Sequence, residues 1–134
     1  MIQYVLDTNI VSYCPEGLFE LEKKIVSVLD NDDKIILSPV TMYEILRGLY
    51  AVKANRRLAL FTTLSRHFEE KDIVRDDWIK AAELYADNLS RPMSESDLLQ
   101  AAFCMRNGYT LVTNNTKHFE HLHNLHLENW IIIN

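Results

Sequence analysis

Short apolar runs alternate along the chain with longer segments in which apolar residues recur every three or four positions. The short runs are rich in Ile, Val, Leu and Tyr, as strands are, and they predict strands at residues 2–6, 34–37, 72–74, 109–112 and 130–133. The longer segments have the spacing of amphipathic helices, for example Leu18, Leu21, Ile25 and Leu29. Strands separated by helices favour an α/β fold with a mainly parallel sheet, because parallel neighbours need a crossover connection.

Polar and small residues mark the ends of the predicted helices. Ser38 and Pro39 supply an N-cap and a proline at the first helical position, and Asn107 with Gly108 forms a C-terminal cap. Helices are predicted from 10 onwards after a turn at 7–9, at 18–29, from 39 to 48 or beyond, at 54–68, from a cap at 76–77 to 89, and from a cap at 94 or 96 to 107. We expect them to cover both faces of the sheet, as a three-layer α/β sandwich.

The chain has the size and composition of one globular domain. Its 134 residues are 48% hydrophobic and 25% charged, and they include only three Gly and three Pro. We therefore expect residues 1–134 to form a single domain whose core needs neither a disulfide nor a metal. The longest apolar runs have only a few residues, so we expect no segment that spans a membrane.

Charge and cysteine content limit the partners and the compartment. Nineteen Asp and Glu against fourteen Lys and Arg give a net charge of −5, so a nucleic-acid role must depend on a local site. Cys14 and Cys104 form no CxxC pattern, and residues 1–6 run directly into Asp7 without resembling a secretory signal. These features predict reduced thiols in a cytoplasmic protein.

Three acidic residues stand where an α/β fold places active sites. Asp7 directly follows the first predicted strand, Glu44 lies about one and a half turns into the helix that begins at Pro39, and Asp97 lies in the first turn of the last helix. Sites gather beyond the carboxyl ends of parallel strands, so the three carboxylates converge if both helix starts flank that edge. Crowded carboxylates are stabilised by a hard cation such as Mg²⁺ or Mn²⁺.

A structural interpretation of the same acids stays open at this point. Asp7 can be an N-cap, Asp97 a first-turn acid favoured by the helix dipole, and Glu44 a solvated helix residue.

Four motifs in order change this balance. They are residues 4–10 (YVLDTNI), 38–48 (SPVTMYEILRG), 97–102 (DLLQAA) and 111–115 (LVTNN). Together they resemble the motifs of PIN-domain ribonucleases, and the similarity is greatest to VapC-type toxins of bacterial toxin–antitoxin pairs. The similarity extends over nearly the whole chain.

The resemblance implies a metal-dependent endoribonuclease built on a parallel five-stranded sheet. It makes Asp7 and Asp97 the ligands of Mg²⁺, with Mn²⁺ also suitable, and Glu44 the group that orients or deprotonates the attacking water. Asn9 and Thr113 would support the ligands by hydrogen bonds. It further implies an RNA substrate, often transfer RNA in such relatives, a cognate antitoxin as partner, and a homodimer.

The chain departs from the family pattern after the strand at 109–112. Many relatives carry a fourth acid there, whereas this chain has Asn115 and His118, ahead of Phe119. An amide oxygen attracts a second dication less than a carboxylate does, so one firmly bound ion is expected. The alternative is a catalytically weakened PIN-like module that binds RNA or antitoxin. A phosphoryl-accepting receiver domain fits poorly, since it needs a further acid after the first strand.

Basic, histidine and aromatic residues outside these motifs allow two interpretations each. Arg47, Lys53, Arg56 and Arg57 are either RNA contacts or an exposed helix face. The cluster His118, His121, His123 and His126 does not fit one helical face, which favours a surface loop over a metal site. Aromatic residues at helical spacing, namely Phe61, Phe68, Trp78 and Tyr85, are interpreted as core or subunit contacts.

Overall fold

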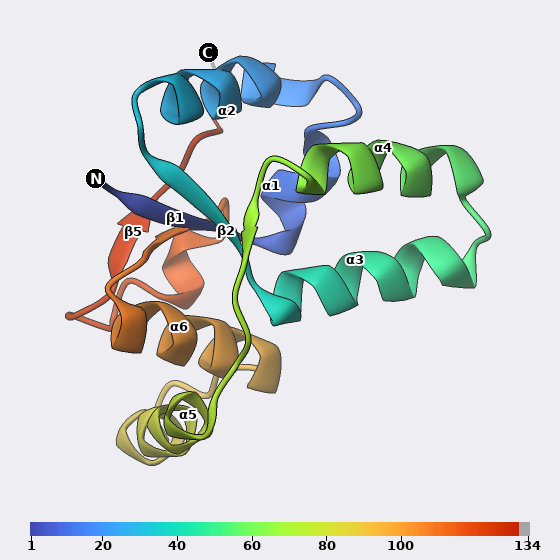
Figure 1. The fold of residues 1–134 in the computed structure, drawn as a ribbon. Coiled ribbons are helices and arrows are strands. Elements are labelled where there is room, and N and C mark those ends of the chain that lie inside the picture. Colours follow the sequence, from blue (N-terminus) through green and yellow to red (C-terminus); the bar gives the residue numbers. More distant parts are fainter. Residues whose placement is uncertain (132–134) are drawn as a thin grey trace.

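The computed structural model describes residues 1–131 as one sheet with helices on both sides (Figure 1). The strands are β1 (Gln3–Leu6), β2 (Lys34–Leu37), β3 (Glu69–Glu70), β4 (Thr110–Val112) and β5 (His126–Glu128). The α-helices are α1 (Thr8–Tyr13), α2 (Leu21–Asp30), α3 (Pro39–Ala51), α4 (Asn55–Ser65), α5 (Arg75–Asp87) and α6 (Glu95–Asn107), and the 3₁₀ turns are η1 (Leu18–Glu20) and η2 (Thr116–His118). No helix in this part of the chain is long and apolar enough to cross a membrane.

All five strands are parallel, in the order β3-β2-β1-β4-β5. β1 is central, and Val5 pairs with Ile36 on one side and Leu111 on the other. Because the three central strands, β1, β2 and β4, are covered on both faces, their residues are nearly all apolar and do not alternate with polar ones. The predicted α/β sheet is therefore confirmed, and it is wholly rather than mainly parallel in residues 1–131.

The sheet separates two hydrophobic cores, which confirms the predicted three layers. On one face Leu6 and Leu37 pack with Ile10, Ile25 and Phe61 from α1, α2 and α4. On the other face the strands pack against α5 and α6 through Val5, Ile36, Leu111, Leu84 and Phe103. Successive strand residues point to opposite faces, so each of the three central strands, β1, β2 and β4, contributes to both cores.

Both edge strands differ from the prediction. β3 is Glu69–Glu70 rather than 72–74, and β5 is His126–Glu128 rather than 130–133. Edge strands tolerate polar residues because only one side is paired, so an apolar pattern does not reveal them. Trp130 is buried against the ring of Tyr4, with centroids 5.2 Å apart, but lies outside any strand, and residues 132 and 133 lie outside the described part of the chain.

Three predicted helix starts also shift, and α1 already begins at Thr8, inside the turn predicted at 7–9. The helix predicted at 18–29 begins at Leu21, because Phe19 and Glu20 have positive φ angles of 58° and 54° that no helix continues. α5 begins at Arg75, before the expected cap at 76–77. Asp77 lies inside the first turn, where its buried carboxylate accepts from the backbone N–H of Val74 (2.9 Å).

Candidate active site

Asp7 lies where β1 ends and α1 begins. Its N–H donates to the carbonyl of Val112 (2.8 Å) and extends the β1–β4 pairing by one residue. Its Oδ1 accepts from the N–H of Thr8 (2.9 Å) and its Oδ2 from the Thr113 hydroxyl (2.9 Å). Asp7 is therefore the N-cap of α1, as the structural interpretation held, and it also faces the end of β4.

Thr113 has a fixed orientation. It is fully buried, its N–H donates to the carbonyl of Glu128 (3.0 Å), and its hydroxyl oxygen accepts from the N–H of Asn115 (3.0 Å). The Thr113 oxygen accepts from the N–H of Asn115, and its own O–H donates to the carboxylate of Asp7. Thr113 thus holds one carboxylate oxygen of Asp7 in place.

The electrostatic environment of Asp7 disfavours its charged form. Burial raises the pKa of Asp7 above its ordinary value, and the nearby charge of Asp97 raises this pKa further. Hydrogen bonds from Thr113, Thr8 and Gln100 oppose this rise in the pKa of Asp7 without cancelling it. A cation beside Asp7 would offset the cost of the buried charge.

Asp97 and Glu44 reach the same end of the sheet from two other elements. Asp97 lies in the first turn of α6, which Ser94 caps by accepting from the N–H of Asp97 (3.1 Å). Glu44 on α3 accepts through Oε1 from the hydroxyl of Thr8 (2.8 Å). The fold thus brings Asp7 near Asp97 and links Glu44 to the residue beside Asp7.

The side chains of the two candidate asparagines, Asn9 and Asn115, make no hydrogen bond to the three acids in the described structure. Asn9 is half-buried in the first turn of α1, and its side chain has no hydrogen-bond partner among residues 1–131. Asn115 contributes its backbone N–H to Thr113. Among the described residues no three His, Cys, Asp or Glu side chains form a ready-made metal cluster.

A buried polar chain joins the elements that carry the acids, and the sequence pattern did not reveal it. The hydroxyl of Ser38 donates to Oε1 of Gln100, and Nε2 of Gln100 donates to the hydroxyl oxygen of Thr41 (2.8 Å). Thr41 in turn donates to the carbonyl of Leu6 (2.9 Å). This chain fixes α6 against the start of α3 and both against the end of β1. The available signal was Gln100, a polar residue that interrupts an apolar run on α6 between Leu98 and Phe103.

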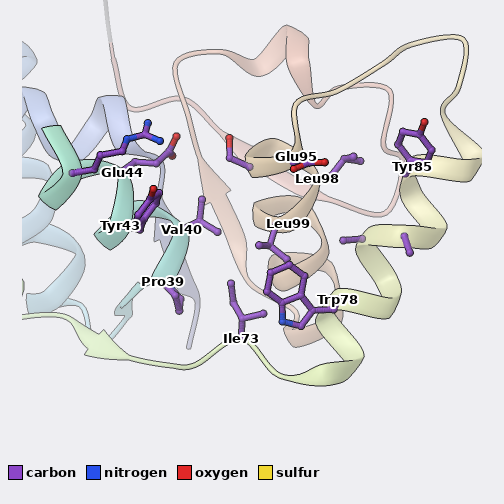
Figure 2. A pocket seen from close by; sticks show the side chains of 14 residues that line it. Pro39, Val40, Tyr43, Glu44, Ile73, Trp78, Tyr85, Glu95, Leu98 and Leu99 are labelled. Atoms are coloured by element: carbon purple, nitrogen blue, oxygen red, sulfur yellow. The ribbon is translucent and has the colours of Figure 1, made fainter.

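A groove lies beside Glu44, between α3, α5 and the start of α6 (Figure 2). Its volume is about 730 Å³. Tyr43, Trp78 and Tyr85 line it and are 60%, 57% and 61% exposed. Of the four aromatic residues interpreted as core or subunit contacts, Phe61 and Phe68 belong to the core, while Trp78 and Tyr85 face solvent.

The predicted RNA contacts divide between two places. Arg47 lines the groove together with Glu44, and its guanidinium lies 5.2 Å from the ring centre of Tyr43. Lys53 lies in the turn between α3 and α4, and Arg56 and Arg57 lie in the first turn of α4, where Arg57 pairs with Glu16 (3.4 Å). From Glu44 to this turn α3 extends on the order of 10 Å. Only Arg47 therefore shares a surface with one of the three acids.

The histidine cluster is only partly a surface loop. His118, His123 and His126 are exposed, but His126 belongs to β5, so that part of the loop prediction is wrong. His118 lies close to Asp97, with Nδ1 3.3 Å from Oδ2. The sequence did not indicate this contact, because it depends on how the segment after β4 folds back over the start of α6.

Comparison with known protein families identifies the family of this chain. The PIN domain model matches residues 4–124, which include all three acids. The chain belongs to the PIN-domain family. This PIN domain is 30% identical to the ribonuclease VapC2 of Haemophilus influenzae, over 98% of this chain and 100% of that one. It is 27% identical to the tRNA(fMet)-specific endonuclease VapC of Shigella flexneri, over 97% and 99% of the two chains.

A solved structure gives the same result for the fold. The structure of VapBC2 from Rickettsia felis bound to a DNA fragment from its promoter matches this PIN domain with a TM-score of 0.88 and 26% identity. The match covers 96% of this chain and 99% of that one. The PIN domain described here is therefore of the VapC type.

Proposed function

We propose that this chain is a metal-dependent endoribonuclease, the toxin of a toxin–antitoxin pair. The observation that carries the proposal is the half-buried carboxylate of Asp7, which Thr8 and Thr113 hold and whose pKa is raised by desolvation and by Asp97. A buried carboxylate with a second one nearby is costly unless a cation is bound. VapC relatives are named ribonucleases, which supports RNA as the polymer that is cut.

Asp7 and Asp97 are the residues that would hold Mg²⁺ or Mn²⁺. Two carboxylates suit Mg²⁺, which accepts oxygen ligands and keeps several waters. When bound, such an ion activates a water and neutralises charge that develops on the phosphate. Asn115 stands where relatives have an acid, so the local charge favours one firmly bound ion.

The protein's own groups orient the reaction. Thr8 and Thr113 hold the two oxygens of Asp7 in defined directions. Glu44, held by the hydroxyl of Thr8, is the base that takes the proton of the attacking water. A general base must lie within hydrogen-bond reach of that water, and the Thr8 bond fixes Glu44 at the edge where Asp7 lies.

The substrate class and partner follow the relatives. The Shigella relative is named as specific for tRNA(fMet), so we propose transfer RNA as the first substrate to test. The Rickettsia structure is a VapBC2 complex, which supports a cognate antitoxin as the partner of this chain. We propose the cytoplasm, where both would meet.

Cleavage of transfer RNA tests the proposal directly. The antitoxin-free protein is incubated with a total transfer-RNA pool and with Mg²⁺ or Mn²⁺, and the products are separated on a denaturing gel. We expect cutting that needs the ion, stops with a chelator and is lost in Asp97→Asn, because that change removes one of the two proposed ligands. Folded protein that binds RNA and cuts none with either ion would instead support the PIN-like binding module.

We further propose that the chain forms a homodimer through the groove shown in Figure 2. The groove is apolar, with exposed Trp78 and Tyr85, and it carries Arg47 on one wall and Glu95 on the other. A two-fold symmetric interface places the same surface of the two copies against each other. Arg47 of one copy can therefore face Glu95 of the second, and the same contact occurs twice.

Sedimentation velocity of single variants checks the dimer. Trp78→Ser is expected to shift the protein towards monomer, because a large aromatic anchor at an interface contributes about 2 kcal/mol or more. Tyr50→Ser is the matched control, since Tyr50 is 62% exposed on α3 but does not line the groove. Equal dimer fractions in both variants would contradict this interface, and a monomeric native protein would contradict the dimer.

A further inference from the structure

A second hollow borders Asp97 and shares no lining residue with the aromatic groove. It has a volume of about 550 Å³. One wall is the segment that precedes α6, and the other is the segment that contains η2. The charged and histidine side chains on these walls are those of Arg91, Asp97, Lys117, His118, Glu120 and His121. We call this surface the Arg91–Lys117 hollow.

Its two permanent cations have no acidic partner. Arg91 and Lys117 are exposed, and within residues 1–131 neither forms an ion pair. Two acids, Asp97 and Glu120, also line the hollow. A divalent ion held by Asp7 and Asp97 would offset the charge of Asp97. Glu120 then offsets one of the two cations, and one positive charge stays in excess. The hollow then attracts anions although the whole chain is acidic.

His121 adds an unused hydrogen-bond donor. Both of its ring nitrogens are shielded from solvent and have no partner in the described structure. A neutral imidazole always carries one N–H, and a buried donor without an acceptor is costly. His121 lines the hollow, so a rotation of its imidazole would turn the N–H towards an acceptor that is bound there.

His118 connects the hollow to the active site. It stands at the rim with 59% of its side chain exposed, and its Nδ1 lies 3.3 Å from Oδ2 of Asp97. A ligand in the hollow therefore lies beside the carboxylate that is proposed to hold the metal. Whatever binds there is adjacent to the group being cut.

We propose that the Arg91–Lys117 hollow binds a backbone phosphate of the RNA next to the phosphate that is cleaved. This inference rests on the proposed function. A phosphate is an anion whose oxygens only accept, so it matches Arg91, Lys117 and the N–H of His121 together. The hollow then fixes the path of the strand past Asp97. It differs from the RNA contacts expected on α3, the turn after it and the start of α4, namely Arg47, Lys53, Arg56 and Arg57.

The salt dependence of RNA binding tests the inference. Binding of a fluorescein-labelled single-stranded RNA is measured by anisotropy with Mg²⁺ present, in a Glu44→Gln background that removes the proposed base and leaves both proposed metal ligands in place. With Arg91→Ala and Lys117→Ala combined, we expect the slope of log affinity against log salt to fall by about 0.7, the value for one phosphate on a single strand, and the affinity at 0.1 M salt to fall about five-fold. Arg66→Ala is the matched control, since Arg66 is exposed and lines none of the described hollows.

Four outcomes separate this inference from the function on which it rests. The smaller slope in the double variant, with Arg66→Ala unchanged, supports it. If native protein cuts RNA and the double variant keeps the native slope, the hollow is overturned and the nuclease stands. If the double variant loses antitoxin binding while its RNA slope is unchanged, the hollow is a protein contact and the inference is overturned. Native protein that neither binds nor cuts RNA overturns both.

Discussion

Asp7→Asn is expected to lower RNA cleavage by about 100-fold or more, because a proposed metal ligand is worth several kcal/mol to the transition state and each 1.4 kcal/mol is ten-fold in rate. The loss is measured as kcat/KM on a transfer-RNA substrate at saturating Mg²⁺. Direct calorimetric titration with Mn²⁺ should show weaker binding by the same variant. Cleavage within a few-fold of native would mean that Asp7 is only the N-cap of α1.

The same variant is expected to be at least as stable as native protein in metal-free buffer at neutral pH. Burial and Asp97 raise the pKa of Asp7 in the folded state, so the folded protein holds that proton more tightly than the unfolded chain. The cost to stability grows as pH rises through the interval between the ordinary and the raised pKa. Asparagine has no such cost, so its advantage should disappear when the pH is lowered below that interval.

Asp33→Asn is the matched control, because the pKa of Asp33 is shifted in the opposite direction to that of Asp7. The N–H of Ile2 and the side chain of Asn31 donate to Asp33 and lower its pKa. Its contribution to stability is therefore present at neutral pH and lost as pH falls through the lowered pKa. We expect Asp33→Asn to be less stable than native at neutral pH and to cut RNA normally. A large loss of stability in Asp7→Asn would show that the cap outweighs the buried charge.

Thr41→Val is expected to destabilise the fold by about 2–3 kcal/mol, because the carbonyl of Leu6 and one N–H of the Gln100 amide both lose their bond to Thr41 in the interior. Valine has nearly the same shape as threonine, so little packing is lost. Urea unfolding followed by circular dichroism measures the change. RNA cleavage should also fall, since Thr41 holds α3, and with it Glu44, against the end of β1.

Thr62→Val is the matched control for this experiment. Thr62 is exposed on α4, and its hydroxyl donates only to the carbonyl of Leu58 one turn earlier (2.8 Å). Water can replace that bond, so we expect a change within about 0.5 kcal/mol. Equal effects of the two changes would mean that the buried polar chain contributes nothing beyond the loss of a hydroxyl.

The acids were predictable from sequence because their positions depend on local structure. Asp7 follows an apolar strand, and Ser38 with Pro39 and Ser94 set the starts of the two helices that carry Glu44 and Asp97. Parallel strands then bring these starts to one edge of the sheet. The edge strands were placed wrongly, because Glu69–Glu70 and His126–Glu128 are polar and pair on one side only.

The sequence alone determined the central strands and the three-layer fold of this protein. The signals were apolar periodicity and cap residues, and both act over a few neighbouring positions. Only the tertiary structure decided the bond between Thr113 and Asp7, the Ser38–Gln100–Thr41 chain, and the contact of His118 with Asp97. These pairs are separated by between 21 and 106 positions in the sequence. Such contacts form only after loop closure brings distant segments together, and their geometry depends on packing that no local pattern encodes.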